Sequence, residues 1–168
     1  MPEATIRPAA ESDVPAIQEM IRELAEFEKL SDQVTSTDAD LQAALFGESS
    51  CAEALVAAEG DRPIGYALFF TNYSTFNGRP GLYLEDVYVR PAHRGTGVGK
   101  QLLKQLAAIA AERDYGRMDW SVLDWNQRAI DFYESHGASV LQEWRFVRTE
   151  REGIQRLAGQ AAPSGDQP

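Results

Sequence analysis

The chain has 168 residues, of which 43% are hydrophobic and 25% are charged, so it is long enough to bury a core without metals or disulfides. Its single cysteine, Cys51, excludes an intramolecular disulfide and a cysteine-rich metal site. No apolar run approaches the roughly 18 residues of a membrane-spanning helix, and the first ten residues do not resemble a signal peptide. We therefore expect a cytoplasmic globular protein.

The chain is acidic, with 26 Asp and Glu against 16 Lys and Arg and a formal net charge of −10. A field of this sign repels nucleic acid and raises the local concentration of small cations. An acidic surface also improves solubility, so charge alone does not choose a function. It favours a small cationic partner over nucleic acid, and the absence of long apolar runs argues against a membrane partner.

The apolar pattern predicts strands and helices along the whole chain. Apolar residues recur every three or four positions in the predicted helices, and the predicted strands are short apolar runs between turn formers. The predicted helices are residues 12–27, 38–46, 98–114, 126–136 and 150–158. The predicted strands are residues 5–7, 53–59, 64–70, 82–89, 118–123 and 140–149. This order predicts a single α/β domain, residues 1–158, with a mixed sheet covered by helices on both faces.

Two segments are expected to lack regular structure. Residues 73–81, YSTFNGRPG, are rich in turn formers and aromatic residues. We expect them to form a loop over the mouth of a site carried by the following strand. Residues 159–168, GQAAPSGDQP, are expected to be a disordered tail.

The predicted strand 82–89 carries two acidic residues, Glu85 and Asp86, within an apolar run. Neighbouring side chains of a strand point to opposite faces, so one of the two should face a site unless a bulge turns both toward it. Such a carboxylate can act as a base or bind a cation. Asp86 could equally be the partner of a backbone amide or an arginine.

Three glycines follow this strand in the sequence RGTGVG, Arg94 to Gly99, at the start of a predicted helix. The P-loop pattern would require glycine at Arg94 and serine or threonine at Gln101, and the dinucleotide pattern GxGxxG fails in both frames. Glycines nevertheless let backbone N–H groups approach an anion at the positive end of a helix. The segment therefore indicates a phosphate-binding loop of another kind, or else a surface turn.

The stretch Arg94 to Gly99 matches the Q/R-x-x-G-x-G/A signature of the GNAT superfamily of N-acetyltransferases. Residues 21–34, 83–89 and 122–138 resemble the diamine (spermidine/spermine) acetyltransferases, and most closely their thialysine N-epsilon-acetyltransferase branch. The resemblance extends to about Leu157. It implies a GNAT fold whose mostly antiparallel sheet splays at its central strands. It also implies direct transfer from acetyl-CoA to a primary amine, without a metal, by a homodimer.

The resemblance also implies a coenzyme site. Backbone amides of the glycine loop would hold the pyrophosphate of acetyl-CoA, and the backbone N–H of Val87 would face the acetyl carbonyl. Tyr133 matches the general acid of the family, although its spacing alone favours an ordinary tyrosine on a half-buried helix face. Asn126 matches a contact to the coenzyme arm, and it could equally be a helix cap. The implied coenzyme-binding residues are Val87, Tyr88, Val89, Arg94, Gly95, Thr96, Gly97, Val98, Gly99, Lys100, Asn126 and Tyr133.

An acceptor amine must lose a proton before it attacks. With a pKa of about 10.4, roughly one amine in a few thousand is neutral at pH 7. We expect Glu85 to be the base, directly or through a water, with Asp86 as a second anion that binds the ammonium. The resemblance adds Phe27, Glu28 and Phe76 as acceptor contacts. Phe27 stands where the spermidine type has tyrosine, which favours a short amino acid or diamine over a long polyamine.

Two other functions remain open. One is acetylation of a protein or peptide on the same fold, and the other is a non-catalytic acyl-CoA-binding module. The bulky segment 73–81 favours a small substrate. The combination of Glu85, Asp86 and Tyr133 favours an enzyme over a binding module.

Overall fold

The computed structural model describes residues 4–159. Their contacts divide the chain into two compact units, one ending at Ser121 and one beginning at Val122. Each unit is described by itself below. Apart from Gly159, the predicted tail lies outside the described residues, and the single domain stays a prediction.

The first unit is built on a five-stranded sheet with the order β1-β2-β3-β4-β5. Strands β1 to β4 pair with their neighbours in antiparallel orientation, and β5 pairs with β4 in parallel orientation. The predicted mixed, mostly antiparallel sheet is therefore confirmed. Its strands are β1 (Thr5–Pro8), β2 (Glu53–Glu59), β3 (Arg62–Ser74), β4 (Arg79–Val89) and β5 (Met118–Trp120).

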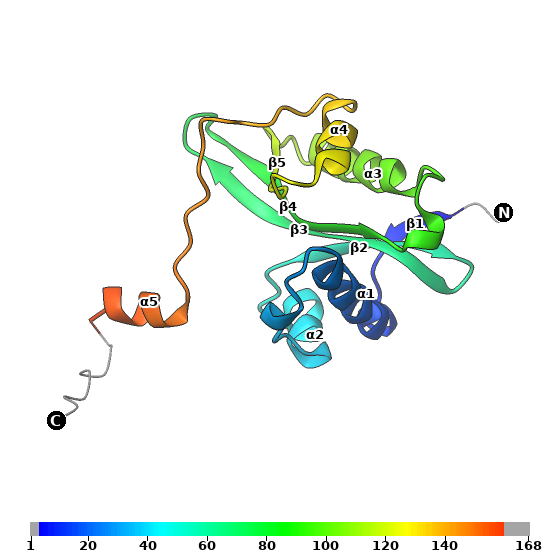
Figure 1. Cartoon of the computed structure of the whole chain (residues 1–168), viewed down its shortest axis with the longest axis horizontal. Helices are drawn as coiled ribbons and strands as arrows, with labels where there is room; N and C mark the ends of the chain where they lie inside the picture. Colours follow the sequence, from blue (N-terminus) through cyan, green and yellow to red (C-terminus); the bar gives the residue numbers. More distant parts are fainter. Residues whose placement is uncertain (1–3, 160–168) are drawn as a thin grey trace. The chain divides into compact units, whose positions relative to one another are not determined.

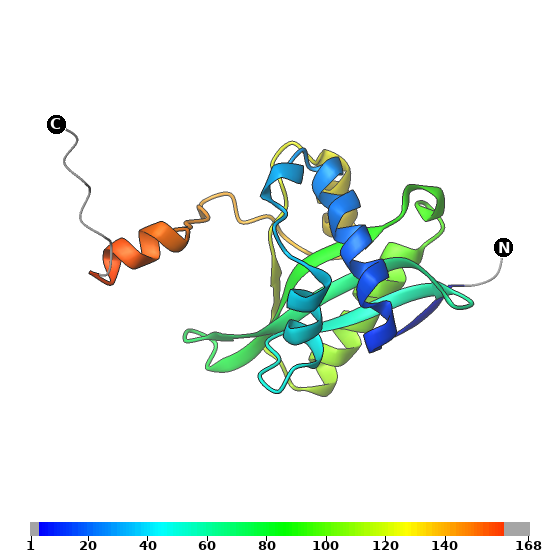
Figure 2. The ribbon, with the colours of Figure 1, turned by 90° about the horizontal axis from the view of Figure 1, so that it is seen from below.

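Helices cover both faces of this sheet, as predicted. Helices α1 (Val14–Phe27) and α2 (Asp38–Phe46) lie on one face, and α3 (Val98–Glu112) lies on the other (Figure 1). Figure 2, seen from below, shows α1 and α2 in front of the sheet. Short 3-10 turns occupy Glu11–Asp13, Ser31–Gln33 and Pro91–His93. Within residues 4–159, every helix is too short or too polar to span a bilayer.

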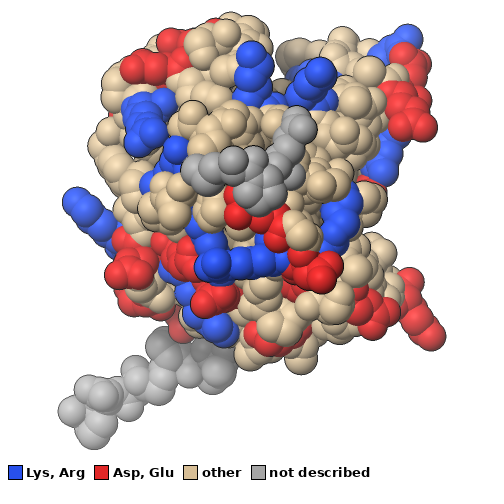
Figure 3. All heavy atoms as spheres, turned by 90° about the vertical axis from the view of Figure 1, so that its right-hand side faces the viewer, with Lys and Arg blue, Asp and Glu red and all other residues tan. Residues whose placement is uncertain are grey.

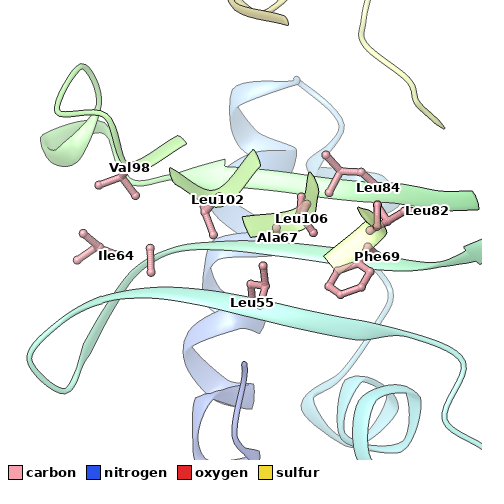
Figure 4. Packing of buried hydrophobic residues seen from close by; sticks show 11 residues of the cluster. Leu55, Ile64, Ala67, Phe69, Leu82, Leu84, Val98, Leu102 and Leu106 are labelled. Atoms are coloured by element: carbon pink, nitrogen blue, oxygen red, sulfur yellow. The ribbon is translucent and has the colours of Figure 1, made fainter. Parts of the chain in front are cut away.

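Each face of the sheet carries its own apolar cluster. Figure 4 shows Leu55, Ala67 and Leu84, from three adjacent strands, beneath Leu102 and Leu106 of α3. Both α3 leucines are 0% exposed, and burial of one leucine side chain contributes roughly 2 kcal/mol. This packing fixes α3, and with it the glycine loop before its first turn, against the central strands.

The segment 73–81 is a tight hairpin and not the predicted loop over a site. Strand β3 runs to Ser74, β4 begins at Arg79, and only residues 75–78 form the turn. The turn formers mislead because Gly81 lies within β4, where a Cβ would come 3.1 Å from the carbonyl oxygen of Arg117. This glycine permits close strand packing and does not end the strand.

The second unit contains α4 (Gln127–Glu134) and α5 (Arg151–Leu157), both of which were predicted within a few residues. The predicted strand 140–149 is wrong, and the strand predicted at 118–123 ends at Trp120. A strand requires partners for its backbone N–H and C=O groups. The described part of this unit, residues 122–159, contains no strand that could provide them.

Charged side chains of both signs are intermixed on the face that Figure 3 displays. The excess of acidic residues is therefore not gathered into one large patch on that face. A preference for a cation must depend on a local group of carboxylates as well as on net charge.

Candidate active site

A β-bulge in β4 lies at the pair of central carboxylates. The ladder between β3 and β4 pairs Leu68 with Asp86 and Phe69 with Leu84, so that Glu85 has no partner in the register. One extra residue bends the strand and shifts its side-chain alternation by one position. The bulge therefore decides which face each later residue of β4 occupies.

The residues on either side of the bulge show this reversal. Leu84 and Val87, three positions apart, both pack in the cluster beneath α3. Tyr88 packs in the cluster beneath α1 and α2, and Asp86, two residues before it, shares that face. The sequence allowed for a bulge at this point, and the structure contains one. It gives the two carboxylates different surroundings.

Asp86 is partly buried, whereas Glu85 is exposed. The hydroxyl of Tyr66 donates a hydrogen bond of 3.2 Å to Oδ2 of Asp86. Burial, together with the charges of Glu85 and Glu28, raises the pKa of Asp86 to about 6, against the lowering effect of the Tyr66 hydrogen bond. The sequence analysis considered a backbone amide or an arginine as the partner of Asp86, and the observed partner is the hydroxyl of Tyr66. A carboxylate with this pKa is suited to accept a proton near neutral pH.

The end of α1 brings two predicted acceptor residues to the same region. Phe27 is the last residue of α1 and is 43% exposed. Glu28 caps the helix, and burial raises its pKa. Its charge acts on both Asp86 and Tyr66. Three carboxylates, one at the end of α1 and two on β4, are therefore close enough for the charges of Glu28 and Glu85 to act on Asp86.

Phe76 does not join this group within the first unit. It lies in the turn between β3 and β4 and is 99% exposed. Arg79, at the start of β4, is already six positions from Glu85, which corresponds to roughly 20 Å of strand. The role of Phe76 as an acceptor contact stays a prediction.

The ladder between β4 and β5 ends at the pair Leu84 and Trp120, although β4 continues to Val89. Strand β5 pairs along all three of its residues, so the edge of β4 from Glu85 to Val89 has no neighbouring strand on the β5 side among the described residues. The predicted splay of the central strands stays a prediction.

The unpaired edge of β4 carries the N–H of Val87. Arg90 donates its backbone N–H to the carbonyl oxygen of Ile64 on the β3 side. Backbone groups of an antiparallel strand alternate in direction. Val89 and Val87 consequently direct their N–H and C=O groups away from β3, toward the edge of β4 that has no neighbouring strand.

The glycine loop has the geometry of an anion site. Gly95 and Gly97 have φ values of 79° and 93°, and a Cβ on either would meet nothing within 4 Å. Gly97 caps α3, whose first N–H groups have no carbonyl partner within the helix. These N–H groups lie at the positive end of the helix, which is the kind of position that binds a phosphate group.

The side chain of Arg94 connects this loop with α1. Its guanidinium lies 5.1 Å from the ring centroid of Phe27 and 5.2 Å from that of Tyr88. Its Nε donates a hydrogen bond of 2.8 Å to the carbonyl oxygen of Val89. Arg94 therefore holds a predicted acceptor residue against the strand that leads into the predicted donor loop.

Asn126 and Tyr133 belong to the second unit. Asn126 precedes α4, and its Oδ1 accepts a hydrogen bond of 3.3 Å from the N–H of Ala129. Asn126 is therefore a helix cap in this structure. The ring of Tyr133 lies 5.5 Å from that of Phe132. The coenzyme contact of Asn126 and the acid role of Tyr133 stay predictions.

Among residues 4–159, no group of three or more His, Cys, Asp and Glu side chains is arranged to hold a metal ion. The profile of the Acetyltransferase (GNAT) family matches residues 17–138. The chain belongs to the GNAT acetyltransferase family. It is an N-acetyltransferase, and the family and fold predicted from the sequence are confirmed.

Individual relatives extend over nearly the whole acetyltransferase. Thialysine N-epsilon-acetyltransferase of Bos taurus is 42% identical over 165 residues, which cover 92% of this chain and 96% of that protein. L-ornithine N5-acetyltransferase NATA1 of Arabidopsis thaliana is 30% identical, with 90% of this chain and 86% of that protein covered. An integron cassette protein from the mobile metagenome of V. cholerae has a TM-score of 0.77 at 29% identity, with coverages of 93% and 98%.

Proposed function

We propose that this enzyme transfers the acetyl group of acetyl-CoA to the side-chain amine of a small cationic amino acid or diamine. The observation that carries the proposal is the group of three carboxylates, Glu28, Glu85 and Asp86, at the end of α1 and the bulge of β4. Two relatives are named for thialysine and ornithine, both of which are amino acids with a side-chain amine.

The glycine loop is the proposed donor site. The backbone amides of residues 95–100 would hold the pyrophosphate, and exposed Lys100 adds positive charge in the first turn of α3. When bound, acetyl-CoA supplies the acetyl group that is transferred. The N–H of Val87 would stabilise negative charge that develops on the acetyl oxygen, and one such donor contributes roughly 3 kcal/mol where it has been tested.

The carboxylates of β4 are the proposed proton acceptors. We favour Asp86 as the base, because its burial and its raised pKa of about 6 reduce the difference from the pKa of an ammonium group. Glu85 and Glu28 then bind the cation and offset its desolvation. Asp86 would take one proton from the ammonium before the neutral amine attacks. Tyr133 would donate its proton to the sulfur as the C–S bond breaks, and the second proton of the new C–N group would return to the Tyr133 oxygen.

We propose that the enzyme acts as a cytoplasmic homodimer. The resemblance to the dimeric diamine acetyltransferases supports this proposal. Light scattering coupled to gel filtration is expected to give twice the chain mass of 18.6 kDa.

A panel of amines tests the function directly. We expect thiol release from acetyl-CoA with thialysine, lysine, ornithine and putrescine, and a kcat/KM for the best amino acid roughly tenfold or more above that for spermidine, because one missing pocket contact costs about 1–3 kcal/mol. Faster acetylation of a peptide would instead favour a protein acetyltransferase. Tight acetyl-CoA binding without thiol release for any amine or peptide would indicate a binding module.

Arg94→Lys tests the connection between the two halves of the site. Lysine keeps the charge but loses the planar group that stacks between Phe27 and Tyr88. Each stacking contact contributes about 0.5–2 kcal/mol, so we expect the KM values of both acetyl-CoA and the amine to rise by roughly 2- to 30-fold. Steady-state kinetics with both substrates varied measures this. An increase confined to the KM of acetyl-CoA would contradict the connection with Phe27.

A further inference from the structure

Tyr66 of β3 is a fully buried tyrosine beside the proposed base. Its side chain is 0% exposed and packs in the cluster beneath α1 and α2. A hydroxyl in such surroundings is unfavourable unless it is hydrogen-bonded. Phenylalanine would fill nearly the same volume without this requirement. The hydroxyl donates its hydrogen bond to Oδ2 of Asp86, which makes that bond the feature to explain.

The hydrogen bond depends on the bulge at Glu85. Tyr66 is opposite Tyr88 in the ladder, and Asp86 is opposite Leu68, so Tyr66 and Asp86 are diagonal neighbours on one face of the sheet. Diagonal neighbours are within reach of an aromatic side chain. Without the extra residue, Asp86 would lie on the opposite face. The register of β3 and β4 therefore brings this phenol to this carboxylate.

The groups around Asp86 have opposite effects on its ionisation. Glu85, next to it on β4, and Glu28, at the end of α1, both disfavour its ionised form. The hydrogen bond from Tyr66 favours the ionised form. Burial and the negative charge of Asp86 raise the pKa of the Tyr66 phenol well above its ordinary value, so the phenol keeps its proton and remains a donor.

We propose that Tyr66 is a positioning residue for the acetyl transfer, whose hydroxyl holds Oδ2 of Asp86 so that Oδ1 is presented to the acceptor ammonium. The inference rests on the proposed function, because it concerns the same acceptor site. Because Tyr66 is 0% exposed, we expect it to touch neither substrate. It acts through the orientation and ionisation of Asp86.

Tyr66→Phe tests the proposal in the intact enzyme. Loss of a donor to the charged form raises the pKa of a carboxylate. We expect the acid limb of the pH profile of kcat/KM to move up by about one pH unit, which corresponds to roughly tenfold lower activity below the limb. The KM of the amine is expected to rise, and the KM of acetyl-CoA is expected to stay the same.

Tyr115→Phe is the matched control, because it also removes a hydroxyl, one that bonds Thr71 at 2.6 Å. Its acid limb is expected to coincide with that of the wild type. A codon-directed 3-fluorotyrosine at position 66, whose phenol is a stronger donor, is expected to move the limb down. A titration of the Asp86 carboxyl carbon by NMR, without substrates, should show the same order.

The failures of the two proposals are distinguishable. If Asp86→Asn keeps the wild-type acid limb, Asp86 is not the base and that part of the proposed function is wrong. If Asp86→Asn abolishes the limb but Tyr66→Phe lowers only the melting temperature, with an unmoved limb and an unmoved carboxyl titration, Tyr66 is structural and the inference is overturned.

Discussion

Tyr133→Phe is expected to lower kcat by about 10²- to 10⁴-fold, the usual effect of removing a general acid. Phenylalanine keeps the ring that lies 5.5 Å from Phe132, so α4 should retain its packing. A thiol has a pKa of about 8.5, so departure as the unprotonated thiolate costs only roughly 2 kcal/mol at neutral pH, and protonation of the sulfur removes that cost. The KM of acetyl-CoA is expected to stay within about twofold, since the loss concerns an interaction of the transition state.

Gln127→Ala provides the control for Tyr133, because it changes the same helix. It removes an exposed hydrogen bond of 2.7 Å between Gln127 and Asp131 and nothing assigned to the site. Its kcat is expected to match that of the wild type. If Tyr133→Phe also turns over normally with acetyl-CoA saturating, Tyr133 has no part in the mechanism.

The helices and most of the order of elements along the chain were predictable because their signals are local. The spacing of apolar residues from Val14 to Phe27 and from Val98 onward is a property of consecutive residues, and both helices form there. The strand predicted at 140–149 does not form, which shows that a local apolar pattern is not sufficient to predict a strand. An apolar segment is a strand only if another strand pairs with it, and one segment of sequence does not contain its partner.

In the candidate site, too, the features that depend on contiguous residues were predictable and those that depend on strand pairing were not. The carboxylates of β4 and the glycine loop were found from the sequence, since strand, loop and helix are contiguous there. Which of Glu85 and Asp86 is the better candidate for the base could not be predicted from the sequence, because the surroundings of each depend on a bulge defined by the pairing of β4 with β3. Tyr66 was missed for the same reason. In an apolar run, a tyrosine is indistinguishable from ordinary core until the cross-strand register is known.

Asp86→Asn is the second variant with a large expected effect. If Asp86 is the base, kcat/KM should fall by about 10²- to 10⁴-fold at pH 7, and the acid limb near the pKa of about 6 should disappear. Glu85→Gln is the comparison, because it neutralises the adjacent exposed carboxylate. We expect it to raise the KM of the amine, with a much smaller loss of kcat. The opposite ranking would restore Glu85 as the base.

The same substitution is expected to stabilise the fold at neutral pH. The pKa of Asp86 is about 6 in the folded state against an ordinary value of 3.8, so between these values the folded state binds more protons than the unfolded state. The free energy of unfolding therefore falls as pH rises through this window. A shift of this size corresponds to roughly 2–3 kcal/mol at pH 7, and asparagine removes that cost.

Thermal unfolding of Asp86→Asn measures the gain, which should be about 4–9 °C at pH 7.5 for a chain of this size. The difference from the wild type should shrink below pH 6 and vanish near pH 4, where Asp86 is protonated and as neutral as asparagine. An equal melting temperature at both pH values would show that Asp86 is not held ionised at a cost. Loss of activity together with gain of stability would instead identify Asp86 as a charge that the fold retains for acetyl transfer.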